Sequence, residues 1–346
     1  MEQPNWIKTI LTPFSWLYGF ITSLRNLLYD FQILHAEKSP QYTISIGNIT
    51  VGGTGKTPMT EYLVRLLRPT QQMAILSRGY GRKTKGFILA NRQCSAIDIG
   101  DEPLQYFEKF GENITVAVCE KRVVGAQQLA TLRPNVKLIL LDDAFQHRAI
   151  VQDTVLLLND YHRPFYNDMP FPAGRLRETR SGATRADAIV VTKCPADLPD
   201  SEKEQINSQI RKYARPEAPI FFSYIRYAEP LSYSGHPIQL NNVKLVAGIA
   251  HPKTFIEHTR SQMNVLEEII FPDHHNYTSN DLEGLIKYLK NDTFVVTTEK
   301  DMVKLKPLVE KAGIAAQFAY IPIVVDFKND TSRFNEWILQ KTRNIR

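Results

Sequence analysis

A glycine-rich loop between an apolar run and a helical pattern constrains this chain more than any other feature of its sequence. The run Thr43–Ile46 predicts a strand, and the segment GNITVGGTGKTP follows at positions 47–58. Glycines let successive backbone N–H groups point at phosphate oxygens, while a lysine reaches the β- and γ-phosphates and a hydroxyl ligates Mg²⁺. The pattern predicts a nucleotide-binding loop of the P-loop type, made by Thr50, Val51, Gly52, Gly53, Thr54, Gly55, Lys56 and Thr57.

The loop departs from the strict P-loop pattern at one position. That pattern, G-x-x-x-x-G-K-[ST], requires glycine at position 50, where this chain has Thr50. The glycines come later, at positions 52 and 53, as in the G-G-x-G-K-T variant of several P-loop families. A tight turn that only joins a strand to a helix is the alternative interpretation. The Gly-Lys-Thr ending favours the phosphate-binding one.

Apolar runs and helical patterns alternate from Tyr42 onward, as a parallel α/β sheet requires. We predict an α/β fold, with a P-loop-containing parallel sheet flanked by helices and a second, smaller α/β domain. The first part is predicted to contain strands at Thr43–Ile46, Met73–Ser77, Ile114–Val118, Lys137–Leu141, Val155–Leu158 and Ala188–Thr192, with helices near Met59–Leu67, Pro103–Phe110 and Val123–Leu132. Further strands are predicted at Ile220–Tyr224, Lys244–Ile249, Thr293–Thr297 and Tyr320–Val325.

A break in both patterns near Tyr213–Pro219 predicts a domain boundary, because the run Ala-Arg-Pro-Glu-Ala-Pro suits neither helix nor sheet. We expect residues 1–30 to form an N-terminal membrane-associating helix and residues 31–215 to form the P-loop domain. Residues 216–346 are expected to form the smaller α/β domain, which closes over the active site.

Composition narrows the class of protein only slightly. With 43% hydrophobic and 23% charged residues, the chain has the composition of a folded protein and not of a disordered one. A net charge of +6 fits an anionic partner, such as a nucleotide, a phosphorylated substrate or a membrane surface. Cys94, Cys119 and Cys194 are far apart and form no C-x-x-C pair, which argues against a disulfide framework and a zinc site and favours a reducing compartment.

The N-terminal segment is apolar and flanked by basic residues. From Thr9 to Leu24 it carries no charge, and Lys8 and Arg25 lie on either side. The segment is shorter than the roughly 20 residues that a membrane-spanning helix needs, and no small-x-small cleavage site follows it. We predict a helix that lies in the membrane interface. A helix packed on the protein's own surface is the alternative.

Two adjacent carboxylates follow one of the predicted strands. Val136–Leu141 has the composition of a buried parallel strand, and Asp142 and Asp143 come directly after it. P-loop enzymes hold Mg²⁺ with an aspartate at such a strand end. A turn or a helix cap is the alternative role for the pair.

Other loops predicted to follow strands carry further candidates for phosphoryl transfer. Such a reaction needs cations around the transferred group and something to orient or deprotonate the nucleophile. Each of these side chains alone has a second interpretation as a solvated charge or a helix cap, but α/β folds bind ligands at this edge of the sheet. The candidates are Arg78 and the glycines around Tyr80, the carboxylates Asp101 and Glu102, and the basic pair Lys121 and Arg122.

Taken together, these motifs resemble the tetraacyldisaccharide 4′-kinase family. The resemblance covers nearly the whole chain, with the motifs in the family's order, and includes the short apolar N-terminal segment. It rests on Ser45–Pro58, Leu76–Arg82, Gly100–Pro103, Leu141–Arg148, Pro172–Glu178, Phe271–His274 and Thr298–Asp301.

The resemblance implies a kinase that transfers the γ-phosphate of ATP to the 4′-hydroxyl of a lipid A disaccharide 1-phosphate, with Mg²⁺. It implies that Asp101 is the catalytic carboxylate and that His274 is its partner. From the residues alone, His275 is the alternative to His274, although the Asp-His register favours His274. Asp142 ranks first as a Mg²⁺ ligand, with Thr57, Asp143 and Glu102 as further candidates. The side chains expected to bind the substrate are Arg78, Tyr80, Arg122, Gln146, His147 and Arg175, with Arg148 and Arg177 as additional cations.

A lipid substrate implies that the enzyme works on a membrane surface, at the cytoplasmic face of a bacterial inner membrane and as a peripheral or monotopic protein. We expect no nucleic acid and no obligate protein partner. One rival hypothesis is a membrane-associated P-loop ATPase switch of the partitioning type; Val191–Cys194 is at most a remnant of a GTP-type base reader, so ATP is favoured. The other is a nucleotide-binding membrane scaffold, which would tolerate loss of Asp101.

Overall fold

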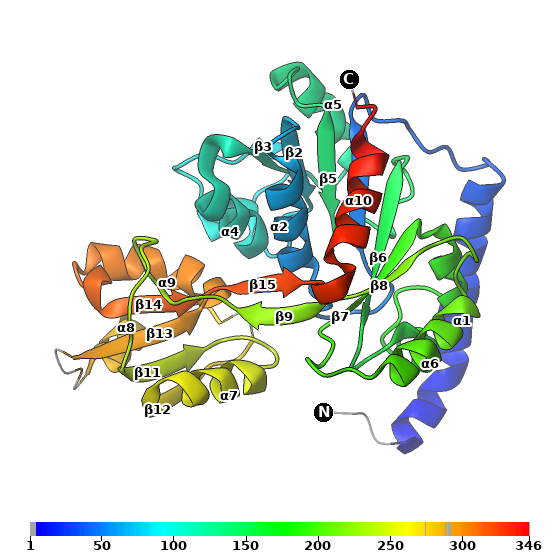
Figure 1. Cartoon of the computed structure of the whole chain (residues 1–346). Helices are drawn as coiled ribbons and strands as arrows, with labels where there is room; N and C mark the ends of the chain where they lie inside the picture. The colour runs from blue at the N-terminus through cyan, green and yellow to red at the C-terminus, as the bar shows by residue number, and fades with distance from the viewer. Residues whose placement is uncertain (1–4, 274, 288, 290–291, 346) are drawn as a thin grey trace.

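The computed structural model describes residues 5–273, 275–287, 289 and 292–345. Two lobes of unequal size lie side by side and a long N-terminal helix, α1, runs along the outer side of the larger lobe (Figure 1). Each lobe is built on its own, mostly parallel sheet with helices packed against it. The predicted α/β class with a second, smaller sheet is confirmed.

Within the described residues, the larger sheet has eight strands in the order β3-β4-β2-β5-β1-β6-β7-β8, all parallel except β3. The strands are β1 Tyr42–Gly47, β2 Met73–Ser77, β3 Ile88–Leu89, β4 Thr115–Val118, β5 Leu138–Asp142, β6 Thr154–Asp160, β7 Ala188–Thr192 and β8 Ile220–Phe222. The helices of this lobe are α2 Lys56–Leu67, α3 Ala96–Ile99, α4 Asp101–Phe110, α5 Arg122–Leu132, α6 Asp200–Arg211 and α10 Thr331–Thr342.

The central strands are apolar on both faces because helices cover both sides of the sheet. Every residue of β5 is buried, including Asp142 at its end. One face packs against α2 and α10, and the other against α6 and the segment that contains Leu176. Because all of these parallel strands point the same way, the loops after β1, β2, β4 and β5 meet at one edge.

The smaller sheet has, in the described part of the chain, the strand order β10-β14-β13-β11-β12. Its strands are β10 Leu231–Ser232, β11 Asn242–Ala247, β12 Asn264–Ile270, β13 Thr293–Thr298 and β14 Phe318–Ile321, and its helices are α7 Lys253–Gln262, α8 Ser279–Ile286 and α9 Glu299–Lys311. One apolar cluster contains Leu104 of α4 together with Met302 and Leu305 of α9. Helix α4 therefore packs against both lobes.

An antiparallel ribbon joins the two lobes. It consists of β9 Tyr224–Tyr227 and β15 Ile323–Asp326, with Tyr227 paired to Ile323 (Figure 1). The predicted single strand Tyr320–Val325 is wrong in this respect, because Pro322 separates β14 from β15. Proline fixes φ and has no N–H to donate to a ladder.

The change from one sheet to the other does not coincide with residue 216. Strand β8 pairs with β7 in the larger sheet, and α10 returns to that lobe after the smaller sheet is complete. Phe334 of α10 packs against Phe221 of β8, with ring centroids 5.1 Å apart. The domain limits 1–30, 31–215 and 216–346 remain a prediction. Residues 228–322 lie between β9 and β15 and contain every strand of the smaller sheet that the structure describes, so they form an insertion in the larger lobe.

Helix α1 extends over Asn5–Asp30, with Pro13 inside it. Its inner side is made of small and polar residues spaced by four: Ser15 is fully buried, and a Cβ on Gly19 would lie 3.3 Å from Thr179. Its outer side is apolar and exposed, and includes Trp16 at 68% and Phe20 at 65%. Within the ranges that the structure describes, no helix has both the length and the hydropathy to cross a bilayer.

Candidate active site

The predicted phosphate loop lies at the carboxyl edge of the larger sheet, between β1 and α2. Gly55 immediately precedes α2 with φ of 86°, and Gly52 has φ of 119°, both in the left-handed region that glycine tolerates best. A Cβ at Gly52 or Gly53 would meet no atom within 4 Å, so the backbone there borders open space. The backbone N–H groups at the start of α2 are therefore available for an anion.

Side chains outside positions 50–57 hold the loop in this shape. The Asn48 amide nitrogen donates to the Thr50 carbonyl at 2.6 Å and to the Thr54 hydroxyl at 2.8 Å. At the end of β7, the Thr192 hydroxyl donates to the Thr54 carbonyl at 2.9 Å, and Lys193 donates to the Gly53 carbonyl. The sequence predicted neither Asn48 nor Lys193 as part of the site.

A strand-like segment also runs beside the loop. The Val51 N–H donates to the Arg175 carbonyl at 2.8 Å, and the Arg177 N–H donates to the Ile49 carbonyl at 2.7 Å. The predicted residue Arg175 therefore supports the loop through its backbone. The same segment brings the Arg177 guanidinium into the site.

The acidic pair lies next to the loop lysine. Asp143 Oδ1 is 3.7 Å from Lys56 Nζ and 2.8 Å from a terminal nitrogen of Arg177. Burial alone would raise the pKa of Asp143, but Lys56 and Arg177 bring it below its ordinary value. Asp143 is therefore an ionised partner of two cations.

Asp142 has a different environment. It is fully buried, and neither carboxylate oxygen has a hydrogen-bond partner among the described residues. Burial, followed by the nearby charges of Glu102 and Asp143, raises the pKa of Asp142 to about 7. A buried carboxylate without donors fits a divalent cation, because an ion can supply the charge that the protein does not.

Helix α4 carries the other predicted carboxylates to this place. Glu102 Oε1 lies 3.3 Å from the Thr57 hydroxyl and 3.5 Å from Lys300 Nζ of α9. Asp101, the first residue of α4, has one carboxylate oxygen 3.0 Å from Lys304 Nζ. The structure thus brings Lys56, Thr57, Asp142 and Glu102 together and places Asp101 beside Glu102.

No group of three His, Cys, Asp or Glu side chains in the described part of the chain can hold a metal ion on its own. This is compatible with a P-loop site, where a hydroxyl and a carboxylate share the ion with the nucleotide's phosphates. Thr57 and Asp142 are the donors that fit this arrangement.

Arg122 and His147 lie behind the acidic pair. The Arg122 guanidinium is buried and donates to the carbonyls of Cys119 at 2.8 Å and Asp142 at 3.1 Å. Burial, followed by the charge of Arg122, lowers the pKa of His147 to about 4, and this ring accepts from the Arg122 N–H at 3.3 Å. Burial lowers the pKa of Arg122 to about 10, and the charge of Arg78 further lowers the pKa values of both Arg122 and His147.

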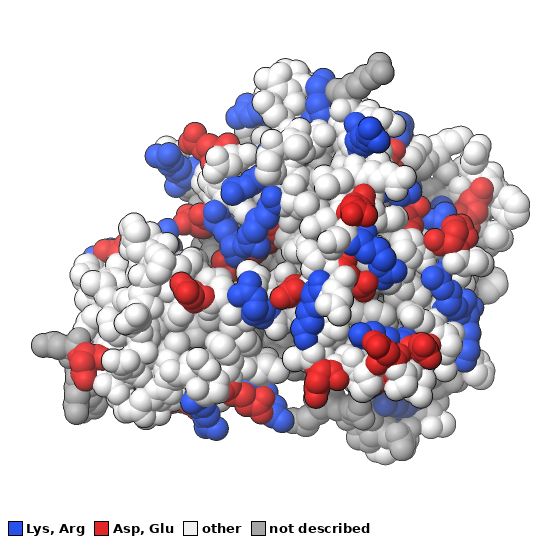
Figure 2. All heavy atoms as spheres, in the orientation of Figure 1, with Lys and Arg blue, Asp and Glu red and all other residues white. Residues whose placement is uncertain are grey.

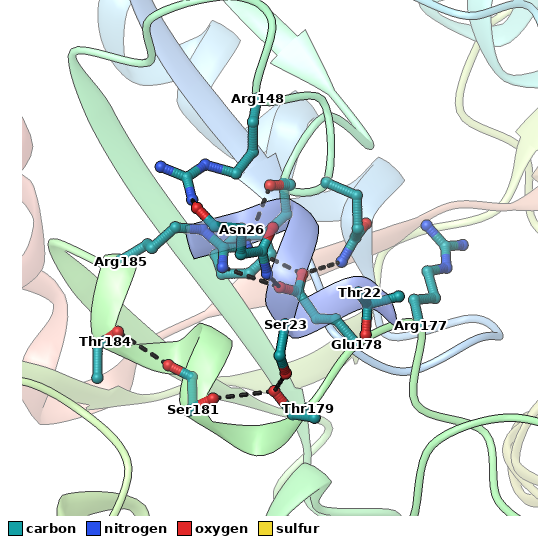
Figure 3. Close-up of polar contacts among 12 residues, drawn as sticks. Thr22, Ser23, Asn26, Arg148, Arg177, Glu178, Thr179, Ser181, Thr184 and Arg185 are labelled. Atoms are coloured by element: carbon teal, nitrogen blue, oxygen red, sulfur yellow. Dashed lines mark hydrogen bonds and ion pairs between the residues drawn. The ribbon is translucent and has the colours of Figure 1, made fainter. Parts of the chain in front are cut away.

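Gln146 belongs to a network that connects helix α1 to the loop. Its amide nitrogen donates to the Asn48 carbonyl at 2.8 Å and to Glu178 at 2.9 Å. Glu178 also accepts from Asn26 of α1 and from both terminal nitrogens of Arg185, as Figure 3 shows. Glu178 ends the Pro172–Glu178 motif, but its role as the centre of this network was not predicted.

The remaining candidates are placed as follows. Tyr80 lies in the loop after β2 and is 80% exposed. Arg148 donates to the Asn26 carbonyl and to Asp30 of α1. His274 lies outside the described residues, and its neighbour His275 is 3.1 Å from Asp281. Figure 2 shows Lys and Arg side chains gathered near the middle of the face drawn, where the lobes meet, with acidic side chains among them.

Comparison with known proteins gives one consistent result. A model of the family described as "Tetraacyldisaccharide-1-P 4′-kinase" matches residues 7–343. The tetraacyldisaccharide 4′-kinase of Flavobacterium psychrophilum is 43% identical over 340 residues, which cover 97% of each chain. That of Cytophaga hutchinsonii is 41% identical over 94% of this chain and 93% of its own.

A solved structure is similar over nearly the whole chain as well. It is a crystal structure of LpxK from Aquifex aeolicus in complex with ATP, with a TM-score of 0.77 and 26% identity. The alignment covers 97% of this chain and 99% of that one.

Proposed function

We propose a mechanism from the premise that this chain belongs to the tetraacyldisaccharide-1-P 4′-kinase family. It is an ATP-dependent kinase that transfers the γ-phosphate of ATP to the 4′-hydroxyl of a tetraacyldisaccharide 1-phosphate in lipid A biosynthesis. One observation carries the mechanism: the first turn of α4 lies against the phosphate loop, with Glu102 3.3 Å from the Thr57 hydroxyl and Asp101 beside it.

The loop from Thr50 to Thr57 binds the phosphates of ATP. Backbone N–H groups at the start of α2 bind the β- and γ-phosphates. Lys56, whose side chain is only 10% exposed, adds a positive charge. Arg177, on the strand-like segment beside the loop, is a second cation for the transferred group, because it already lies 2.8 Å from Asp143.

Thr57 and Asp142 would hold Mg²⁺, with Asp143 and Glu102 as further donors. The support is the buried Asp142 carboxylate, whose oxygens have no donor in the described part of the chain. When bound, the ion neutralises negative charge that develops on the phosphate oxygens. Its charge would also favour the ionised form of Asp142.

Asp101 is the general base in this proposal, and His274 orients it or carries the proton onward. The proton of the 4′-hydroxyl passes to an Asp101 carboxylate oxygen as the sugar oxygen forms its bond to the γ-phosphorus. The bond between that phosphorus and the oxygen bridging to the β-phosphate breaks, and ADP leaves.

The side chains proposed to bind the sugar and its 1-phosphate are Arg78, Tyr80, Arg122, Gln146, His147 and Arg175. Arg78 and Tyr80 lie on the loop after β2, where an approaching headgroup can meet them. Arg122 donates to the Asp142 carbonyl, His147 accepts from the backbone N–H of Arg122, and Gln146 donates to the carbonyl of Asn48, just before the loop. These bonds place the three side chains where they can transmit substrate contacts to the site.

We further propose that α1 attaches the enzyme to the membrane in which its substrate lies, at the cytoplasmic face of a bacterial inner membrane. The helix is docked through its small and polar side, which leaves Trp16, Leu17 and Phe20 exposed. An apolar stripe with basic residues near it suits the headgroup–acyl boundary. The acyl chains of the substrate then need not leave the bilayer.

The test is a transfer assay with γ-labelled ATP, Mg²⁺ and detergent-dispersed tetraacyldisaccharide 1-phosphate. Wild-type protein should label the lipid, and Asp101→Asn should lower the rate by about 100-fold or more, the usual contribution of a general base. Glu108→Gln, on the same helix but away from the loop, is the control and should keep the wild-type rate. Equal lipid labelling by wild type and Asp101→Asn would remove Asp101 from the mechanism. ATP hydrolysis without any lipid product would favour the ATPase switch.

A further inference from the structure

Two lysines one turn apart on α9 face the first two residues of α4. Lys300 Nζ is 3.5 Å from Glu102 Oε1, and Lys304 Nζ is 3.0 Å from Asp101 Oδ2. The two pairs differ in burial: the Lys300 side chain is 37% exposed, whereas that of Lys304 is 7% exposed. An exposed ion pair does little to fix the positions of its two side chains. A buried ammonium group, by contrast, is held in place by its acceptors.

Lys304 makes a second contact within the smaller lobe. Its Nζ donates to the His275 carbonyl at 3.2 Å. His275 is itself fixed, because its ring stacks on Phe271 at 4.4 Å and its Nε2 lies 3.1 Å from Asp281. One ammonium group therefore joins the start of α4 to the loop that contains the Phe271–His274 motif.

We propose that Lys304 is a positioning residue for phosphoryl transfer, which holds the Asp101 carboxylate and the backbone next to His274 in one arrangement. The inference rests on the proposed role of Asp101. A carboxylate that is to meet a sugar hydroxyl gains from being oriented beforehand, because a small misplacement of a reacting group is costly.

Lys304 is not needed simply to join the lobes. Lys306 Nζ of α9 lies 2.5 Å from Glu108 of α4, and Lys109 of α4 lies 2.6 Å from Glu299 of α9. These pairs and the apolar contact of Leu104 with α9 already connect the same two helices. Among these ion pairs, that of Lys304 involves the carboxylate proposed to react.

The experiment compares Lys304→Met with Lys306→Met in the full-length enzyme, with kcat and both KM values measured. Each variant removes one ion pair between α4 and α9 and keeps an unbranched apolar stem. We expect Lys304→Met to lower kcat by on the order of 10- to 100-fold, with KM for ATP and for the lipid changed less than about threefold. Lys304→Arg should restore part of the loss, and Lys306→Met should stay within about twofold of wild type.

A double-mutant cycle with Asp101→Asn separates positioning from an independent role. If Lys304 acts through Asp101, adding Lys304→Met to Asp101→Asn should cause little further loss. Losses that multiply, or a raised KM for ATP or lipid in Lys304→Met, would overturn the inference and make Lys304 a ligand of the substrates. Equal kcat values for Lys304→Met and Lys306→Met would overturn it too.

The two proposals can fail separately. Full activity of Asp101→Asn would end the proposed role of Asp101, whatever Lys304 does. A strongly impaired Asp101→Asn beside a wild-type Lys304→Met would end only the positioning role. Circular dichroism checks the fold of each variant, and Lys304→Gln, which keeps a donor for the His275 carbonyl, replaces Lys304→Met if that variant does not fold.

Discussion

Two buried carboxylates of the larger lobe, Asp142 and Glu178, differ in how their charge is compensated. Glu178 is 2% exposed and accepts from Asn26, Gln146 and Arg185, so its charge is met within the protein. Asp142 has no donor within the described residues. Glu178 therefore stabilises the fold, while the charge of Asp142 is left to be compensated by what the site binds.

Arg185→Met should destabilise the protein by about 3 to 5 kcal/mol, because it leaves the buried Glu178 without its bidentate partner. Denaturant unfolding followed by circular dichroism would measure this. Arg260→Met, which removes an exposed pair with Glu268, is the control and should cost only about 0 to 1 kcal/mol. Similar losses in the two variants would show that Glu178 gains little from Arg185.

Neighbours in sequence predicted the phosphate loop and the acidic pair, and Asp101 and Glu102 were also candidates. The family resemblance added the catalytic role of Asp101, but the contacts of Lys193 and Lys304 were not predicted. The phosphate loop and the acidic pair follow from neighbours in sequence, since a strand end and a glycine run suffice to recognise them. Lys193 and Lys304 are more than 100 positions from the residues they contact, Gly53 and Asp101. No local sequence pattern predicts such a long-range contact, because it depends on how the strands are ordered and how the lobes pack.

At the scale of elements, α1 reverses the usual arrangement of a surface helix. Its small and polar residues face the protein and its apolar residues face outward, including Trp16, Leu17 and Phe20. Tyr18 and Asn26 donate to the segment with Arg177 and Glu178, which borders the phosphate loop. The helix predicted from the sequence is confirmed, and it is docked on the protein as well as exposed.

Trp16→Ser combined with Phe20→Ser should weaken binding to vesicles of anionic phospholipid by roughly 100- to 10,000-fold, since each large apolar side chain contributes about 1.5 to 3 kcal/mol when buried and about 1.4 kcal/mol corresponds to a factor of ten. Co-sedimentation with vesicles is the measurement. Leu339→Ser, at an exposed apolar position on α10, is the matched control and should bind as wild type does. Unchanged sedimentation of the double variant would argue that α1 only packs on the protein.

At the scale of the whole molecule, buried charges also lie between the lobes. Lys109 of α4 is 2.5 Å from Glu61 of α2 and 2.6 Å from Glu299 of α9. Burial, followed by the charge of Glu61, raises the pKa of Glu299 to about 7, although Lys109 and Arg65 oppose the shift. Near neutral pH, the contact between the lobes therefore contains a carboxyl group that resists ionisation.

A carboxyl with a higher pKa in the folded state binds more protons there, so its contribution to stability falls as the pH rises. For Glu299 the fall spans pH 4.5, its ordinary pKa, to about 7. As the pH rises from 5 to 8, the thermal midpoint of Glu299→Gln should therefore increase by a few degrees relative to that of wild type. Glu310→Gln, at an exposed position of α9, should track wild type at every pH. A constant difference between Glu299→Gln and wild type would contradict the assignment.

The arrangement of the lobes was only partly predictable. Alternating strands and helices indicated two α/β units, but the order of strands and the return of α10 depend on long-range pairing. Strand β8 is short and lies beyond the proline-rich break near residue 216, so its composition gave no sign that it completes the larger sheet.

The return of α10 has a consequence for how the protein is made. Phe334 and Ile338 of α10 complete the apolar cluster beneath α2, yet they are synthesised about 100 residues after β8. At translation rates of about 5 to 20 residues per second, a nascent chain waits roughly 5 to 20 s with that cluster uncovered. During this interval the smaller lobe can form on the ribosome, while the larger lobe, begun first, is finished last.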